Sequence, residues 1–317
     1  MKTIASSIGL CVALCSSLLL SGCQSSDATP SQPASNSPAS PKVMTPDWGI
    51  AATLVAMGYP PVAMGDKPFY KEWVGKPLIP ATTYDVGTRY QPNPEMFSQL
   101  DIDLVIDRAF YEHLRPMYGD LPIRSIELNS TNRVATWEDF IDPTLELGKA
   151  INQPQAAQDY LDNSKNQITK AGQTFHTRYP HIKKLAVVQF ADTNNLRMFS
   201  YNSLFQPALD VMDLELVAFA DGNEWGFAPI MLGDLAQLDE DTCLVVVEPI
   251  GDLLKVELED SLVWQRLGYS FDEDPKSARK GRCLALLPAT WNNSGVASMK
   301  VLADRLMNAT FVGNTDL

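Results

Sequence analysis

Three tryptophans lie in polar, loop-like segments, an unusual place for so large an apolar side chain. They are Trp73 in FYKEW, Trp225 in DGNEWG and Trp291 in PATWNN. Each could cover the edge of its own lobe, but aromatic side chains on loops at strand ends commonly form the walls of ligand clefts. Three in similar contexts favour a shared aromatic cleft. Trp48, Trp137 and Trp264 lie in helix-like stretches and are predicted to serve packing.

Arg89 is the candidate polar contact in this cleft. It follows Gly87 and precedes Pro92 and Pro94. Gly allows a sharp turn and the prolines stiffen the chain beyond it. An Arg on such a loop can direct its planar donor fork at an oxygen-rich ligand. A surface ion pair with a nearby Asp is the alternative that the pattern leaves open.

Catalytic and cofactor motifs are missing from the sequence. It has no G-x-G-x-x-G, Walker A or G-x-S-x-G pattern. Its only imidazoles are His113, His176 and His181, and their spacing does not match a metal-ligand motif. We therefore predict a protein that is not an enzyme, has no catalytic residue or cofactor and holds no metal directly.

Composition limits the partners. The 317 residues include 38 acidic and 25 basic side chains, which gives a net charge of −13. An acidic surface repels phosphate backbones, so nucleic acid is excluded as a partner. An apolar share of 45% is typical of a folded globular chain, and the length suits two packed lobes.

The first residues have the features of a bacterial lipoprotein leader. Lys2 precedes a short apolar segment, and LSGC ends at Cys23 in the manner of a lipobox. We predict a signal peptide over 1–22 and lipidation of Cys23. The Ser- and Pro-rich segment 23–43 is predicted to be a flexible linker. The expected location is periplasmic, with the protein anchored to a bacterial membrane by lipid alone.

Cys243 and Cys283 are the remaining cysteines outside the leader and the lipidation site. Each begins a strand-like apolar run. In an oxidising compartment they could form a disulfide if the two strands are neighbours. Two buried free thiols are equally compatible with the sequence.

Short apolar runs alternate with helical patterns, which is typical of α/β folds with parallel sheets. The expected helix is Ile50–Met57, and the expected strands are Pro61–Met64, Leu104–Ile106, Ile123–Leu128, Leu185–Phe190, Cys243–Val247 and Leu284–Leu287.

Between the two strand series lies a long helical segment. Its apolar stripe contains Ala157, Leu161, Ile168, Ala171 and Phe175. We predict two Rossmann-like α/β lobes with central, mainly parallel sheets, joined by one long rigid α-helix. The expected ranges are 44–143 for the N-terminal lobe, 144–180 for the helix and 181–317 for the C-terminal lobe.

An ordered set of sequence blocks resembles the periplasmic ferric-hydroxamate siderophore-binding proteins that serve ABC importers. The resemblance extends from about Asp47 to Leu306. The matching blocks are DW at 47–48, YKEWV at 70–74, DVGTR at 85–89, YNSLFQ at 201–206, NEWG at 223–226, VWQ at 263–265, GR at 281–282 and PATW at 288–291.

This resemblance implies specific roles. Arg89 and Tyr111 would hydrogen-bond the iron-chelating oxygens, and Trp73, Trp225 and Trp291 would form the aromatic walls. Asn293 stands where the family often has another aromatic, which implies a more polar rim. Glu112 and Asp239 or Glu240 are candidates for docking on the permease.

The resemblance implies a monomeric binding component of an ABC importer. Its ligand would be an iron(III)–siderophore complex of the hydroxamate type, passed on to the permease. Haem, a corrinoid or a carboxylate-containing siderophore on the same fold is the first alternative. An envelope-tethered hydrolase is the second, although Ser203 and Ser294 have no His nearby in sequence.

Overall fold

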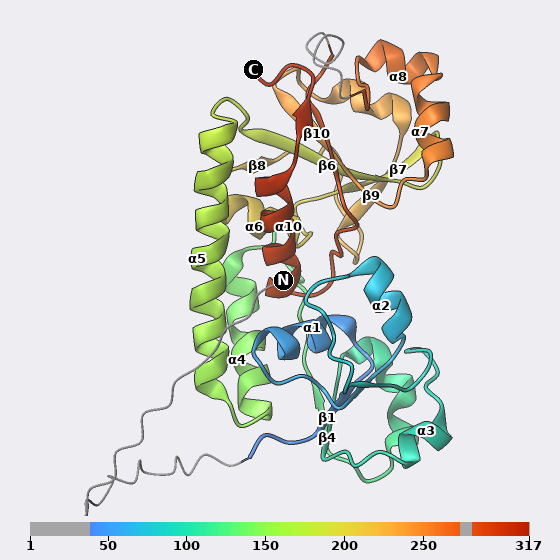
Figure 1. Cartoon of the computed structure of the whole chain (residues 1–317), viewed down its shortest axis with the longest axis vertical. Coiled ribbons are helices and arrows are strands. Elements are labelled where there is room, and N and C mark those ends of the chain that lie inside the picture. The colour runs from blue at the N-terminus through green and yellow to red at the C-terminus, as the bar shows by residue number, and fades with distance from the viewer. Residues whose placement is uncertain (1–38, 273–280, 317) are drawn as a thin grey trace, which may run out of the picture. The chain divides into compact units, whose positions relative to one another are not determined.

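The computed structural model describes residues 39–272 and 281–316. The predicted signal peptide, the lipidation site Cys23 and most of the predicted linker lie outside these residues. The described chain forms two α/β lobes, each built on its own sheet (Figure 1). The predicted fold class is confirmed.

The N-terminal lobe contains a five-stranded sheet in the order β3-β2-β1-β4-β5, and every pairing is parallel. Its central strands are buried, as expected for a parallel sheet covered by helices on both faces. The strands are β1 (Val43–Thr45), β2 (Ala63–Met64), β3 (Tyr84–Asp85), β4 (Leu104–Asp107) and β5 (Ile123–Ser125).

Two helices of this lobe begin at residues whose side chains cap them, namely Asp47 and Asn93. Asp47 caps the first, because its side chain accepts a hydrogen bond from the Ile50 amide. The elements are α1 (Trp48–Ala56), α2 (Lys67–Trp73), α3 (Pro94–Ser98), the 3₁₀ helices η1 (Ala109–Tyr118) and η2 (Trp137–Phe140), and α4 (Ile141–Ala150).

The C-terminal lobe contains a mixed sheet. Strands β11, β10, β6 and β8 run parallel to one another. The antiparallel pairs are β12 with β11, β7 with β6, and β9 with β7. The strands are β6 (Lys184–Phe190), β7 (Asn195–Phe199), β8 (Glu215–Leu216), β9 (Phe227–Met231), β10 (Thr242–Val247), β11 (Leu284–Leu287) and β12 (Phe311–Val312). The helices are α6 (Phe205–Val211), η3 (Leu232–Gln237), α7 (Asp252–Glu259), α8 (Leu262–Leu267) and α10 (Val296–Asn308).

One long helix, α5 (Pro154–Arg178), runs alongside both lobes (Figure 1). All five residues of the predicted apolar stripe are buried on it. It begins at Pro154 and not at 144, because the preceding residues form the separate helix α4. Proline has no amide hydrogen to donate, so it suits the first turn of a helix and ends the one before it.

Gly172 allows α5 to pack directly on the end of α6. A Cβ atom at this position would lie 2.5 Å from the carbonyl oxygen of Met212. Gly172→Ala should therefore destabilise the protein by about 1–2 kcal/mol, even after the gain in helix propensity. Gly233→Ala is the matched control, because a Cβ atom there meets no atom within 4 Å. Urea unfolding of both variants measures the difference, and equal midpoints would contradict this account of α5 packing.

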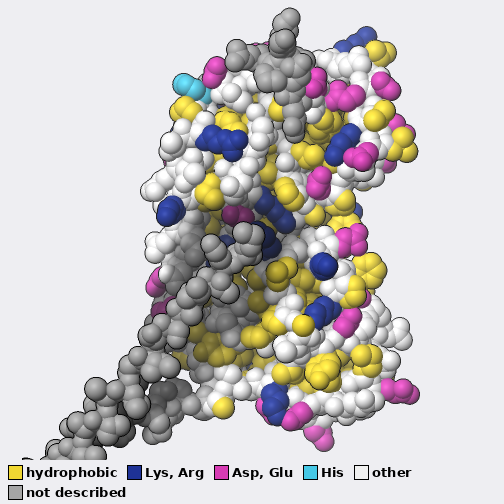
Figure 2. Space-filling view, in the orientation of Figure 1, with side chains coloured by type: hydrophobic (Ala, Val, Ile, Leu, Met, Phe, Trp, Pro, Cys, Tyr) yellow, Lys and Arg dark blue, Asp and Glu magenta, His cyan; other side chains and the backbone are white. Residues whose placement is uncertain are grey.

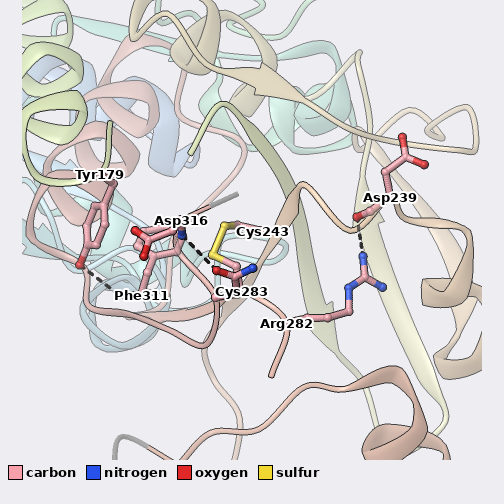
Figure 3. The surroundings of a disulfide bond; sticks show 8 residues. Tyr179, Asp239, Cys243, Arg282, Cys283, Phe311 and Asp316 are labelled. Carbon is pink, nitrogen blue, oxygen red and sulfur yellow. Dashed lines mark hydrogen bonds between the residues drawn. A yellow bond between two sulfur atoms is a disulfide. The ribbon is translucent and has the colours of Figure 1, made fainter. Parts of the chain in front are cut away.

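Cys243 and Cys283 form a disulfide (Figure 3). Strands β10 and β11 are parallel neighbours, and Leu244 pairs with Leu284, so the two cysteines lie side by side. Both are fully buried. The structure thus decides between the two states that the sequence left open, in favour of the bridge.

Acidic side chains are spread over the visible face among basic and apolar ones (Figure 2). Within the described ranges, no helix combines the length and apolar character needed to cross a membrane.

Candidate ligand-binding cleft

The N-terminal lobe gathers polar and aromatic side chains at one edge of its sheet. Trp48 follows β1, Asp66 follows β2, Arg89 follows β3 and Tyr111 follows β4. Because the strands are parallel, these residues share the carboxyl edge. In open α/β sheets, this edge is where ligands bind.

The C-terminal lobe offers the carboxyl ends of three parallel strands. Gln189 lies near the end of β6, Glu248 directly follows β10, and Trp291 comes soon after β11. The two edges face each other, since Trp48 contacts Trp291 with ring centroids 5.3 Å apart. Phe110 also contacts Trp225, which precedes β9, at 5.7 Å between centroids.

A cavity of about 270 Å³ lies between these edges. Trp73, the last residue of α2, contributes the N-terminal wall. The structure therefore brings the three predicted tryptophans into one cavity, each of them partly exposed. The lining residues are Trp73, Gln189, Arg197, Phe199, Trp225, Phe227, Glu248, Ala289, Thr290, Trp291, Asn292 and Asn293.

A larger cavity, about 530 Å³, lies beside α5 and α10. Its walls are mainly apolar and it carries Lys76, Lys170 and Lys300. None of the five predicted ligand-binding residues lines it. We therefore assign the candidate site to the aromatic cavity, on the chemistry of its walls and not on its size.

Arg89 lies at the edge of the aromatic cavity, among rings. Its guanidinium carbon is 3.7 Å from the centroid of Trp48, 4.9 Å from that of Tyr90 and 5.7 Å from that of Trp291. Gly87 has φ +86°, so the expected tight turn before Arg89 is present. The side chain is only 14% exposed.

Asp66 holds the Arg89 loop in place. Its carboxylate accepts a hydrogen bond from the Arg89 backbone amide at 3.0 Å and lies 3.8 Å from Nε. Nη2 donates to the Tyr90 hydroxyl at 2.8 Å. Buried Nε has no hydrogen-bond acceptor among the described residues. Both possibilities left open by the sequence are therefore present: an ion pair with an Asp, and a fork beside an aromatic cavity.

Trp48 combines packing with support of Arg89. The ring is buried, as predicted, and its Nε1 donates to the Gly65 carbonyl at 3.0 Å. A cation over an indole face at this distance contributes about 0.5–2 kcal/mol. The place of Trp48 in a helix does not predict its contact with Arg89, because that contact depends on the position of the loop after β3.

Trp48→Phe should weaken ligand binding about 3- to 10-fold, because the smaller ring supports the guanidinium less well. A double-mutant cycle with Arg89→Ala measures the coupling, and we expect little further loss in the Arg89→Ala background. Trp264→Phe is the control, since Trp264 is buried in the C-terminal lobe away from the cavity. Equal and additive losses in both backgrounds would contradict the supporting role.

Tyr111 is buried at the start of η1, with only 3% of its surface exposed. Burial is the main cause that raises its pKa well above the ordinary value, and the nearby Asp47 carboxylate adds to the effect. The hydroxyl therefore stays protonated at neutral pH and can donate a hydrogen bond. Tyr90 links the two predicted polar residues, because its ring contacts both the Tyr111 ring and the Arg89 guanidinium.

Two exposed aromatics at this edge were not identified from the sequence. Tyr90 and Phe110 contact each other with centroids 6.0 Å apart, and both contact Tyr111. They directly adjoin Arg89 and Tyr111 in the chain. Their position next to these two candidates in the sequence is the feature that could have identified them.

Asn293, which implied a more polar rim, lies at the aromatic cavity. Asn293 lines the cavity, and its side-chain amide lies 3.2 Å from that of Asn129 in the other lobe. Asn292 has a structural role, because its oxygen accepts from the Leu204 amide and its nitrogen donates to the Trp225 carbonyl.

The docking candidates lie in two different places. Glu112 is exposed beside Tyr111, next to the cleft. Asp239 and Glu240 are exposed before β10, at the opposite edge of the C-terminal sheet. The Asp239 carbonyl accepts a hydrogen bond from Arg282 (Figure 3).

Within the part of the chain that the structure describes, no cluster of three or more His, Cys, Asp or Glu side chains is placed to hold a metal ion. Rings line the cavity and the Arg89 guanidinium lies at its edge, whereas the buried Tyr111 is not among the lining residues. Rings beside a guanidinium are suited to binding an organic ligand.

The sequence profile of the periplasmic binding proteins matches residues 43–263, most of the chain. The chain belongs to the periplasmic binding protein family. This confirms the family resemblance and the prediction of a binding protein that is not an enzyme.

Two of the curated relatives that match this binding protein cover most of its length. The iron(3+)-hydroxamate-binding protein FhuD of Escherichia coli (strain K12) is 24% identical over 62% of this chain and 65% of its own, slightly less than two thirds of that relative's length. A putative ABC transporter substrate-binding lipoprotein, YhfQ of Bacillus subtilis (strain 168), is 24% identical over 81% of this chain and 79% of its own.

A solved structure shares the fold. The Fe³⁺–Desferal-bound siderophore-binding protein FhuD from Vibrio cholerae superposes with a TM-score of 0.72 at 18% identity, covering 85% of this chain and 97% of that one. This likeness supports the two-lobed architecture with one long connecting helix.

Proposed function

We propose that this protein is the substrate-binding component of an ABC importer. It binds an iron(III)–siderophore complex of the hydroxamate type in the cleft between its lobes and delivers the complex to a membrane permease. The observation that carries the proposal is the Arg89 guanidinium beside the cavity that contains Trp73, Trp225 and Trp291. The names of the relatives, a ferric-hydroxamate-binding protein and a transporter lipoprotein, support it.

The proposed recognition follows from the chemistry of the ligand. A ferric hydroxamate has an oxygen-rich face with partial negative charge and an apolar or amide periphery. The Arg89 fork and the Tyr111 hydroxyl donate hydrogen bonds to the oxygens. Indole faces cover the periphery. The siderophore fills the coordination sphere of iron, so the mechanism requires no protein ligand to the metal.

Delivery and location complete the proposal. Lipidated Cys23 anchors the protein to the membrane, and the linker allows the body to reach the permease. Among the docking candidates, exposed Glu112 is the best placed to contact the permease from the cleft side, because Asp239 and Glu240 lie at the opposite edge of the C-terminal sheet. The protein acts as a monomer.

The haem alternative requires an axial ligand, and Tyr111 is the available candidate. Burial raises its pKa, so the side chain of the metal-free protein is a neutral phenol that suits a hydrogen-bond donor. Absorbance of the protein with haemin tests the axial role. A hydrolase would need an accessible nucleophile, and the candidate serines Ser203 and Ser294 are both buried.

Intrinsic tryptophan fluorescence tests the proposal, because three tryptophans line the cavity. The titration uses a panel of ferric siderophores, their iron-free forms and haemin. We expect strong quenching by a ferric hydroxamate and weaker binding of its iron-free form. If no ferric siderophore binds more tightly than about 100 μM, roughly −5.5 kcal/mol, the proposed function is refuted.

A further inference from the structure

The C-terminal wall of the cavity carries a second guanidinium, Arg197 of β7. In the antiparallel register Arg197 pairs with Gln189 of β6, and Phe199 pairs with Phe227 of β9. Side chains that are directly opposite, or two residues apart on one strand, share a face of a sheet. These four residues therefore form one face, and all of them line the cavity.

The Arg197 side chain makes few contacts with the rest of the described protein. Nη1 donates to the Gln189 side-chain oxygen at 3.4 Å, and the guanidinium carbon is 5.0 Å from the Phe227 centroid. No carboxylate among the described residues lies within ion-pair distance of it. Arg108 and Arg115 differ in this respect, since each is paired with a carboxylate. Arg197 thus presents an exposed donor fork to the cavity.

Other polar groups stand beside the aromatic rings on this wall. Glu248 holds its position through its backbone, because its carbonyl accepts a hydrogen bond from the Gln189 side chain at 3.2 Å. Thr290 and Asn293 add polar groups to the rim. The fork of an Arg that is stacked against a ring matches a carboxylate with two parallel hydrogen bonds.

We propose that Arg197 is a specificity-determining residue that pairs with a free carboxylate on the organic periphery of the siderophore. The inference rests on the proposed function. Arg89 would contact the iron-chelating oxygens from the N-terminal side, while Arg197 contacts the periphery from the C-terminal side. The preferred ligand is then a ferric hydroxamate that also carries a carboxylate.

Affinity measurements with two probes test this assignment. Ferrichrome is an uncharged trihydroxamate, and ferric aerobactin combines hydroxamates with free carboxylates. Wild-type protein should bind the carboxylate-bearing probe more tightly. Arg197→Gln should weaken binding of that probe about 10-fold or more and change ferrichrome binding less than about 2-fold. Arg197→Lys, which keeps the charge but loses the fork, should give an intermediate loss.

Arg124→Gln is the matched control, because it removes the same charge from an exposed position on β5 that does not line the cavity. It should leave the preference for the carboxylate-bearing probe in place. A wild-type protein that favours ferrichrome, or an Arg197→Gln protein with unchanged affinity for aerobactin, overturns the role of Arg197 while the proposed function stands. A wild-type protein that binds neither these probes nor any other ferric siderophore overturns the proposed function and, with it, this inference.

Discussion

Replacing Arg89 with alanine is expected to weaken binding of a ferric hydroxamate by about 1.5–3 kcal/mol, or roughly 10- to 150-fold. The guanidinium is mostly covered by Trp48, Tyr90 and Asp66. A chelate oxygen that loses this donor in the cleft is left without a partner away from water, which is more costly than the same loss on the surface.

Arg89→Ala should leave the fold intact. Asp66 keeps its hydrogen bond from the backbone amide of residue 89, which does not depend on the side chain. Arg89→Lys retains the charge without the planar fork, so its loss should be smaller. Arg124→Ala is the control, because Arg124 is exposed on β5 and, among the residues that the structure describes, its side chain bonds only the adjacent Ile123 carbonyl. Calorimetric titration measures all three, and an Arg89→Ala affinity equal to wild type would remove Arg89 from the binding site.

Loss of the disulfide should have the largest effect on stability. Cys243 and Cys283 are 40 residues apart in the chain, so the bridge closes a long loop. Closing such a loop limits the unfolded chain and typically contributes about 2–4 kcal/mol. Cys243→Ala combined with Cys283→Ala should lower the free energy of unfolding by that amount, together with a smaller packing loss in the buried core.

Urea unfolding with and without a thiol reductant separates the two contributions. Reductant should destabilise the wild-type protein and leave the double alanine variant unchanged. Wild-type stability that is insensitive to reductant under conditions that reduce the unfolded chain would contradict a stabilising bridge. Ligand affinity should be largely retained, because neither cysteine lines the cavity.

Local patterns were sufficient to predict the architecture. The run Leu185–Phe190 corresponds to β6, and the apolar stripe of α5 is buried as the helical period requires. The predicted range 144–180 begins before α5, because two successive helices give one continuous helical pattern and Pro154 marks the boundary between them. Strands β7 and β9 were missed, since alternating, partly exposed hairpin strands give a weaker signal than buried parallel ones.

Loop residues of the site could be identified by type and context. Trp73, Trp225 and Trp291 come together because each lies near an edge that faces the cleft. Arg197 could not be predicted, because its place in the cavity depends on the register of a hairpin. Whether Cys243 and Cys283 pair depends on the order of strands in the sheet, which apolar runs alone do not define.

The position of iron in the complex tests the central claim most directly. Crystals grown with a ferric hydroxamate and measured at the iron absorption edge would give an anomalous difference peak for the metal. We expect one peak in the cavity between Arg89 and Trp225, with every iron-ligating oxygen supplied by the siderophore. A peak bonded to a protein side chain, or one in the separate cavity beside α5 and α10, would contradict the account.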